Sequence, residues 1–503
     1  MRKTLTAVVL CCAAVIVGRA GDTFDFVIKT TAANQTFGFE VKGASMFDIE
    51  WGDGVQELNV GSGVKTHTFA TAGTYTNKVK GTATRIAFGP AGSNRTPALL
   101  VDITSKLTDG VTGITSSAQM FDGATQITQF TCAEWFNDTS SNVTDMNYML
   151  ARASSFNQDI SSWDVSKVTN MRGLFESANS FNQDLDDWDT GNVKNMIGVF
   201  YMNTGFNGKI GKWNVGKATE ISSFFNGASA FNQDISNWNL SSATSTAKMF
   251  GNAKAFNQPI GKWDVSKVKS MESMFSGASA FNQPIGDWVT SAVTDMSSMF
   301  SGASAFNQPI GDWDVSSVTT MNKMFFGAAS FNQPIGSWDV GEVRGMDSMF
   351  AHAASFDQDI GDWDVSSVTT MKSMFDTAPA FNQPVGRWDT GNVTDMNLMF
   401  YEARAFKQDI SGWDVSGVSN FIGFMTSVTM PTEYYNRLLI RWSRLALQSG
   451  LTFTGGKSKY DLGRPAECRA FLQDTTAGFA WKITDGGSTG DIYREPTTQI
   501  IVY

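Results

Sequence analysis

The stretch FNQPIGDWDVSSVTTMNKMF, residues 306–325, is one copy of a 25-residue repeat that dominates the chain. Its tryptophan belongs to a row of eleven that runs from residue 163 to residue 413 without insertion or deletion, and its first phenylalanine belongs to a row with the same period. A fixed period of this length predicts a solenoid, in which each repeat buries its apolar side against its neighbours. We expect both rows to form core ladders, which include Phe156, Trp163, Phe306, Trp313, Phe406 and Trp413.

Three segments of each copy predict three local structures. The Met-x-x-Met-Phe-x-x-Ala segment has apolar residues at i, i+3, i+4 and i+7, as on one face of a short helix. The Trp-Asp-Val-Ser-x-Val segment is rich in aromatic and β-branched residues and predicts a strand. Asn-Gln-Pro-Ile-Gly before it is typical of a turn. The expected fold is therefore an α+β repeat solenoid of 25-residue coils, each with one short strand and one short helix.

The N-terminal segment, residues 1–20, has the features of a secretory signal peptide. A basic start is followed by an apolar run from Leu5 to Val17, and small residues precede Gly21. The run is too short to span a bilayer, and no second apolar stretch of membrane-spanning length follows, so we expect no integral membrane segment. Removal of residues 1–20 takes away three basic residues and no acid, which changes the net charge from −10 to −13. We expect an extracellular protein, secreted or at the cell surface, whose negative field repels nucleic acid.

The repeats are flanked by two different end regions. Residues 21–90 are strand-like, residues 91–149 contain irregular repeat fragments expected to form a transition and an N-terminal cap, and the eleven regular repeats occupy residues 150–425. Residues 426–503 are expected to form a C-terminal cap unit and tail. Pro431 opens a predicted helix there with apolar residues at 435, 438, 439, 442 and 446, and Gly450 ends it.

Two parts of the chain resemble known families. A WGDG turn at residues 51–54, an H-x-F segment at 67–69 and a GTY segment at 73–75 together resemble the PKD-like β-sandwich of extracellular proteins. The string F-N-Q-[DP]-I-x-x-W-D-V-S-x-V-T-x-M-x-x-M-F resembles the BspA-type leucine-rich-repeat surface protein family, in its Met-Phe/Trp variant, and residues 434–487 resemble that family's terminal unit. The resemblance implies a leucine-rich-repeat-like solenoid and a role like that of adhesins that bind host or neighbouring cells.

Two polar rows inside the repeat have alternative interpretations. The Asn that follows Phe in nine of the eleven copies is expected to hydrogen-bond the backbone of its own coil and of the next. The Asp that follows Trp in eight copies either caps its own turn or, in a stacked row, binds calcium, since carboxylates are calcium ligands in acidic extracellular proteins. The calcium alternative names Asp164, Asp264, Asp314 and Asp364.

The positions that vary from copy to copy are the candidates for binding. The residue before Trp and the residue four places after it are polar, recur on one side of the predicted solenoid, and would line an exposed face. The candidate face comprises Lys167, Lys262, Lys267, Asp287, Asp312, Ser317, Glu342, Asp362 and Arg387. Its expected partner is an extracellular protein or glycan, bound by a monomer.

Catalytic motifs are missing from the sequence. The expected mature chain has only His67 and His352, which leave no His-based triad or zinc cluster, and no GxSxG, P-loop or HExxH motif occurs. We therefore expect no enzyme and no cofactor apart from the calcium alternative. A structural component of an extracellular matrix or surface layer is the main competing function, and a carbohydrate-active β-solenoid enzyme is a remote one.

Overall fold

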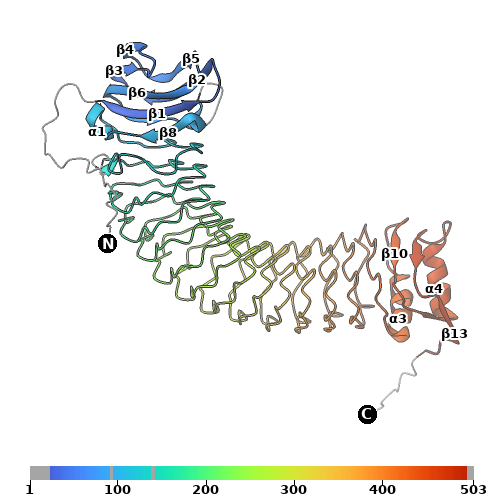
Figure 1. The fold of residues 1–503 in the computed structure, drawn as a ribbon. Coiled ribbons are helices and arrows are strands. Elements are labelled where there is room, and N and C mark those ends of the chain that lie inside the picture. The colour runs from blue at the N-terminus through green and yellow to red at the C-terminus, as the bar shows by residue number, and fades with distance from the viewer. Residues whose placement is uncertain (1–22, 91–94, 138–141, 496–503) are drawn as a thin grey trace, which may run out of the picture. The chain divides into compact units, whose positions relative to one another are not determined.

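The computed structural model describes residues 23–90, 95–137 and 142–495, and the chain divides into two compact units, residues 1–218 and 219–503 (Figure 1). The expected signal peptide, residues 1–20, lies outside the described residues. Among the described residues, no helix has the length and apolar composition needed to cross a bilayer.

The first unit begins with two β-sheets. One sheet has the order β4-β3-β6-β1-β8, with β9 paired to β6, and the other has the order β5-β2-β7. The elements are β1 (Phe24–Thr30), β2 (Gln35–Lys42), β3 (Ser45–Glu50), β4 (Gln56–Val60), β5 (Gly63–Phe69), β6 (Gly73–Thr82), β7 (Arg85–Ala87), the 3-10 helix η1 (Pro97–Leu99), β8 (Leu100–Ile103), α1 (Leu107–Gly110) and β9 (Val111–Thr112). The mostly β character expected for this region is confirmed, and the larger sheet extends beyond residue 90.

An aromatic core joins the two sheets. The alternation of β1 buries Phe26, whose ring centroid lies 5.9 Å from that of Phe37 and 5.5 Å from that of Phe39 on β2. Around the WGDG turn, Trp51 stacks on His67 at 5.1 Å, and His67 Nε2 lies 2.6 Å from Asp53 Oδ2. The aromatic residues singled out in the sequence thus fill the space between the sheets.

The sheets continue directly into the first coils of the same unit. We call the region from β1 to β9 the sheet domain. Its Phe88 stacks on Phe121 at 5.9 Å, and the Leu107 N–H donates to the Trp135 carbonyl at 2.9 Å. From there the coils are joined by single parallel bridges, Ser116 to Asp145 to Asn170 to Asn195. The sheet domain therefore covers the apolar end of this stack.

The coils of the second unit repeat the same arrangement. Parallel bridges link one residue per coil from Glu220 to Asn420, at 25-residue intervals. Inside, Trp338 and Trp363 are stacked with centroids 6.4 Å apart, and Phe306 stacks on Phe331 at 6.0 Å. All six residues of the predicted core ladder are buried.

The helix predicted in each coil does not form. Between residues 142 and 431 the described chain contains no helix, and alternate N–H groups of the Met-x-x-Met-Phe segment point in different directions. Lys323 and Phe325 donate to carbonyls of the next coil, whereas Met324 donates to Met321 within its own coil. Lys323 has a φ of +58°, which a right-handed helix excludes. In the stacked coils, N–H groups that would bond within a helix donate to carbonyls of the next coil instead.

The strand predicted after each tryptophan is also wrong. The Ser316 N–H donates to Asp314 Oδ1 at 3.1 Å, and the Val318 N–H donates to the Val315 carbonyl at 2.9 Å. These local bonds make a turn and use donors that a strand would offer to its neighbour. Only Thr320 forms a β-bridge, so each coil has one bridge residue instead of a strand.

The second unit ends in a cap with two helices and four short strands. These are α3 (Thr432–Trp442), β10 (Thr452–Thr454), β11 (Tyr460–Leu462), α4 (Arg464–Gln473), β12 (Lys482–Thr484) and β13 (Ser488–Ile492). The helix predicted after Pro431 is present and buries residues 435, 438, 439 and 442. It ends at Trp442 rather than near Gly450. The N–H groups of Arg444 and Leu445 bond three residues back instead of four, and Ala446 is exposed.

Candidate binding groove

A ladder of asparagine side chains fixes the turn before each tryptophan. Asn307 Oδ1 accepts the backbone N–H of Asn332 at 2.9 Å and the side-chain amide of Gln333 at 3.0 Å, one coil further on. Asp357 replaces the asparagine in its copy and accepts the same two kinds of donor from the next coil. Lys407 ends the row, because one repeat later the chain has entered α3. The structural role predicted for this row is confirmed for its bonds to the next coil.

The indole N–H groups form a second ladder that the sequence did not reveal. Trp338 Nε1 donates to the Ile310 carbonyl of the preceding coil at 3.1 Å, and Trp413 Nε1 donates to Val385 in the same way at 2.9 Å. The repeated Phe, Trp and Asn side chains thus contribute to packing or to bonds between coils. The side chains that face solvent come from other positions of the repeat.

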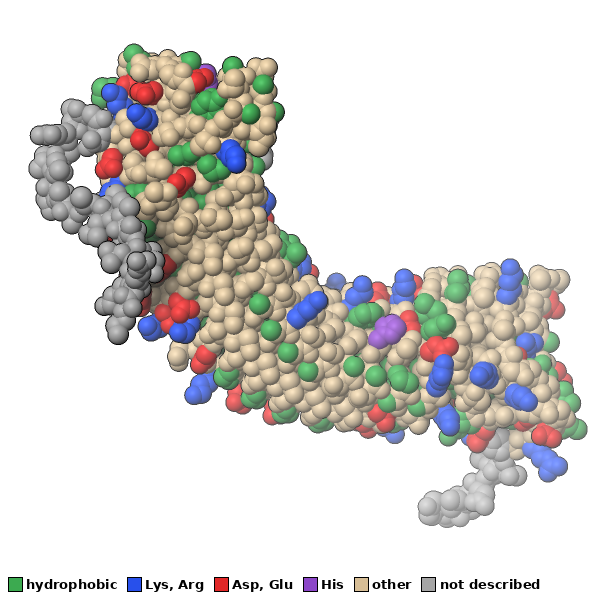
Figure 2. Space-filling model, in the orientation of Figure 1, with side chains coloured by type: hydrophobic (Ala, Val, Ile, Leu, Met, Phe, Trp, Pro, Cys, Tyr) green, Lys and Arg blue, Asp and Glu red, His purple; other side chains and the backbone are tan. Residues whose placement is uncertain are grey.

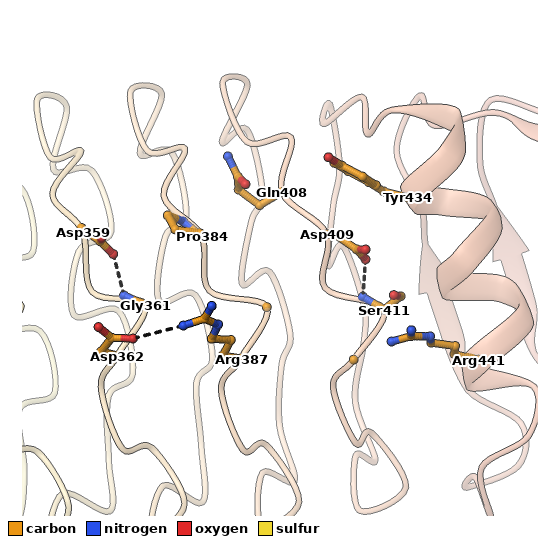
Figure 3. Close-up of a pocket in the computed structure, with 12 residues that line it drawn as sticks. Asp359, Gly361, Asp362, Pro384, Arg387, Gln408, Asp409, Ser411, Tyr434 and Arg441 are labelled. Carbon is orange, nitrogen blue, oxygen red and sulfur yellow. Dashed lines mark hydrogen bonds and ion pairs between the residues drawn. The ribbon is translucent and has the colours of Figure 1, made fainter. Parts of the chain in front are cut away.

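A groove of about 460 Å³ runs over these turns in the last coils of the second unit, next to α3 (Figure 3). We call it the turn groove. Its floor is formed by the last three coils, and Tyr434 and Arg441 of α3 line one end. The residues that line it are Asp359, Gly361, Asp362, Pro384, Gly386, Arg387, Gln408, Asp409, Ser411, Gly412, Tyr434 and Arg441.

The carboxylates of the turn groove are already engaged. Asp359 Oδ1 accepts the Gly361 N–H at 2.9 Å, and Asp362 lies 3.8 Å from the Arg387 guanidinium. Asp409 accepts the Ser411 N–H at 3.0 Å, and its other oxygen accepts a bond from Arg437 of α3 at 3.1 Å. The acidic side chains therefore shape the groove and balance its arginines.

Other groups of the groove are not engaged within the described residues. Ser411 is 2% exposed, and its hydroxyl has no hydrogen-bond partner there. Arg441 is exposed and its guanidinium forms no ion pair with a described residue. Tyr434 is half-buried, with the Arg437 guanidinium 5.7 Å from its ring centroid. A buried hydroxyl without a partner, an exposed cation and an aromatic ring therefore lie at one end of the groove.

The first unit carries a corresponding groove of about 520 Å³ with different chemistry. It is lined by Asp159, Ser161, Asn182, Gln183, Asp184, Asp186, Asp187, Lys209 and Lys212, with no aromatic side chain. Lys209 lies 3.3 Å from Asp184, and Lys212 lies 3.6 Å from Asp187. Here the cations and acids pair with each other across neighbouring coils.

The predicted binding-face residues are all exposed. This holds for Lys167, Lys262, Lys267, Asp287, Asp312, Ser317, Glu342, Asp362 and Arg387. Among these nine residues only Asp362 and Arg387 form an ion pair with each other, and both line the turn groove. The charged side chains of the coils are separated by wide areas of backbone and uncharged polar groups on the face drawn in Figure 2.

Sequence reasoning missed most of the turn groove. Ser411 carried a usable signal, because in the six preceding copies from Gly261 to Gly386 this position is glycine. Tyr434 and Arg441 carried another, since they lie off the apolar stripe of a helix that was itself predicted. What the sequence did not show is that this side of α3 faces the last turn.

The four aspartates named as calcium ligands cap their own turns. In each case the Oδ1 atom accepts the N–H of the serine two residues later, at 2.9 to 3.1 Å. The serine hydroxyl and N–H of residue 316 hold the pKa of Asp314 below its usual range, and the same bonds act on Asp164, Asp264 and Asp364. The described residues contain no group of three or more His, Cys, Asp or Glu side chains that could hold a metal.

Comparison with known proteins identifies the repeat. Four overlapping segments, residues 108–201, 183–288, 272–368 and 335–433, match the family described as Mycoplasma protein of unknown function, DUF285. Neither a curated protein nor a solved structure matches the chain. The matched segments cover the coils of both units.

Proposed function

Because the chain belongs to the DUF285 family, whose description assigns no function, we propose a function from its geometry: an extracellular binding scaffold that presents the turns and variable faces of its coils to a partner. The partner is an extracellular protein or glycan, and the protein is secreted or held at the cell surface. We also propose that the chain is a leucine-rich-repeat-like surface protein of the BspA type, with a PKD-like domain N-terminal to the repeats.

One observation carries this proposal. The recurring Phe and Trp side chains are buried and the recurring Asn side chains bond to the next coil, whereas the nine candidate residues at the variable positions are all exposed. A repeat can therefore change its outward chemistry without disturbing its core. Solenoids use such extended surfaces to bind other molecules.

The features of the chain favour binding over catalysis. Within the described residues, His67 bonds to Asp53, and the ring of His352 contacts Phe326 at 5.2 Å. The grooves over the turns are open, and their carboxylates are engaged by backbone N–H groups or by basic side chains. We propose neither an enzymatic activity nor a cofactor.

A matrix or surface-layer role is less well supported, because each stack has one end that is covered. The sheet domain packs on the first coils of the first unit, and the cap that begins with α3 follows the last coil of the second unit. Open ends would let coils stack between molecules. We therefore propose a discrete monomer.

The test is binding by purified residues 21–503 to a panel of matrix proteins, glycans and whole cells. Saturable binding is expected, and it should weaken when Lys262, Lys267 and Asp312 are changed together to alanine. The matched control changes three exposed residues of the sheet domain, Lys29, Lys42 and Asp109. Large assemblies in sedimentation without binding by the monomer would contradict the proposal and favour the matrix role.

A further inference from the structure

We propose that the turn groove beside α3 is a binding site for a neutral oligosaccharide. The inference rests on the proposed binding function and names the ligand of one part of the surface. It starts from Ser411, whose hydroxyl lines the groove without a hydrogen-bond partner among the described residues. Leaving such a group unsatisfied costs about 1–3 kcal/mol, which a ligand hydroxyl would offset.

The polar groups around Ser411 suit a ligand that both donates and accepts. The Arg441 guanidinium offers only donors, and the carboxylates of Asp359 and Asp362 offer only acceptors. Gln408 uses its amide nitrogen to bind the Asn382 carbonyl at 2.8 Å, and its amide oxygen is a further acceptor. Sugar hydroxyls donate and accept at the same time, and several of them on one ring match this mixture.

The charge of the groove favours a neutral ligand. Three carboxylates and the guanidinium groups of Arg387 and Arg441 line it, and Arg437, which also pairs with Glu433, contacts Asp409. The groove thus has no excess of positive charge to attract an anion, two of its carboxylates are paired with arginines, and the protein as a whole is acidic. A polyanionic glycan would be repelled by this field, and a cationic ligand would gain nothing specific from the groove.

Tyr434 supplies the apolar contact that sugar recognition needs. Its ring lines the groove at the α3 end, and Figure 3 shows it beside Gln408 and Asp409. The negative face of an aromatic ring attracts the slightly positive C–H groups of a sugar ring. Pro384 and Gly386 leave the adjoining floor without long side chains, so a chain of sugar rings can continue along the coils.

The groove of the first unit serves as an internal control. It has the same backbone turns, but no aromatic side chain lines it, and its lysines are paired with Asp184 and Asp187. If the turns alone bound sugars, both grooves would bind. The inference assigns binding to the second unit alone.

The experiment is calorimetric titration of residues 21–503 with neutral hexasaccharides: β-1,4-linked glucose, mannose and N-acetylglucosamine, and α-1,4-linked glucose. Hexagalacturonate is the anionic comparison. At least one neutral probe is expected to bind saturably. Tyr434→Ala should weaken it about tenfold, a loss of about 1.4 kcal/mol, and Ser411→Ala about threefold or more. Tyr434→Phe keeps the ring and should stay within about threefold.

The controls separate the site from the fold. Ser161→Ala and Gln183→Ala in the first-unit groove should leave the affinity unchanged, and every variant is checked for an unchanged thermal midpoint. Preference for hexagalacturonate, or equal loss with the first-unit variants, would overturn the inference. So would the absence of binding to every neutral probe. If matrix proteins or cells were still bound in that case, the proposed function would stand and only the sugar site would fall.

Discussion

The turn before the tryptophan is built differently in the two units, although the core behind it is the same. In the first unit, Lys209 and Lys212 bridge to the acids of the preceding coil, and Asp184 Oδ1 accepts the Lys209 N–H at 2.9 Å. In the second unit four of the eight copies read Pro-Ile-Gly at this place. There a methyl group added to Gly311 would lie 2.6 Å from the Pro334 carbonyl oxygen of the next coil.

This difference shows that coil stacking and surface chemistry are separate properties of the repeat. Charged side chains bridge neighbouring coils at the turn of Lys209 and Lys212, and close backbone approach joins the coils in the Pro-Ile-Gly copies of the second unit. Both arrangements rest on the same indole and asparagine ladders. The residues of the turn can therefore change to suit a ligand without loss of the fold.

The largest expected effect tests the shared core. Trp338→Ala removes a stacked indole and its bond to the Ile310 carbonyl, and Trp188→Ala removes the same contacts in the first unit. Each should lower the free energy of unfolding by about 3–5 kcal/mol, measured by urea denaturation. A cost below about 1 kcal/mol at either site would show that the two cores are not equivalent.

The next effect sharpens the contrast between the turns. Gly311→Ala should destabilise the protein by about 1–3 kcal/mol, because the methyl group meets backbone that cannot move away easily. Ser161→Ala, at the same repeat position in the first unit, should change stability by less than about 0.5 kcal/mol. Equal effects in urea denaturation would remove the distinction between the two kinds of turn.

A pH effect of similar or smaller size belongs to the first unit. Burial raises the pKa of Asp122 to about 6, although the Arg152 guanidinium lies 2.6 Å away. The folded protein then holds a proton that the unfolded chain releases, so stability should fall by about 1–3 kcal/mol as pH rises from about 4 to about 6. Urea denaturation across this pH range measures the slope, and Asp122→Asn should reduce it. Burial raises the pKa of Glu176 too, so the Asp122→Asn variant should still lose some stability as pH rises.

A smaller gain is expected where the second unit lacks a turn cap. Val289 occupies the aspartate position and is 57% exposed. Val289→Asp should add a bond to the serine N–H two residues on and stabilise the protein by about 0.5–1 kcal/mol at neutral pH. Because capping lowers the pKa of such a carboxylate, the gain should disappear as pH falls through that lowered pKa. Val289→Asn should keep its gain in acid, and loss of stability in both variants would contradict the capping role.

The smallest expected effect concerns calcium. The capping aspartates are engaged by their own serines, so chelation with EDTA should leave the thermal midpoint unchanged. The measurement is differential scanning calorimetry with calcium and with chelator. A midpoint that rises with added calcium would revive the ion-binding interpretation of Asp164, Asp264, Asp314 and Asp364.

The sequence alone determined the period, the stacking and the core. Phe306 and Trp313 recur in register in every copy, and residues that recur so strictly must meet their own copies in a stack. The bond of Asn307 to the next coil followed from the same argument. The start of helix α3, and four of its five predicted apolar positions, followed from Pro431 and the helical spacing.

Only the tertiary structure decided the path of the chain within a coil. Met321 to Ala328 has the spacing of a helix, but neighbouring coils compete for its N–H groups, and the competition is invisible in one copy. The groove has the same origin. Ser411 belongs to the last full coil and Tyr434 and Arg441 belong to α3, and only the packing of α3 next to that coil places them around one hollow. The repeated sequence predicts the contacts that every coil makes with the next. It does not predict contacts that occur at only one place in the chain, such as those between α3 and the last full coil.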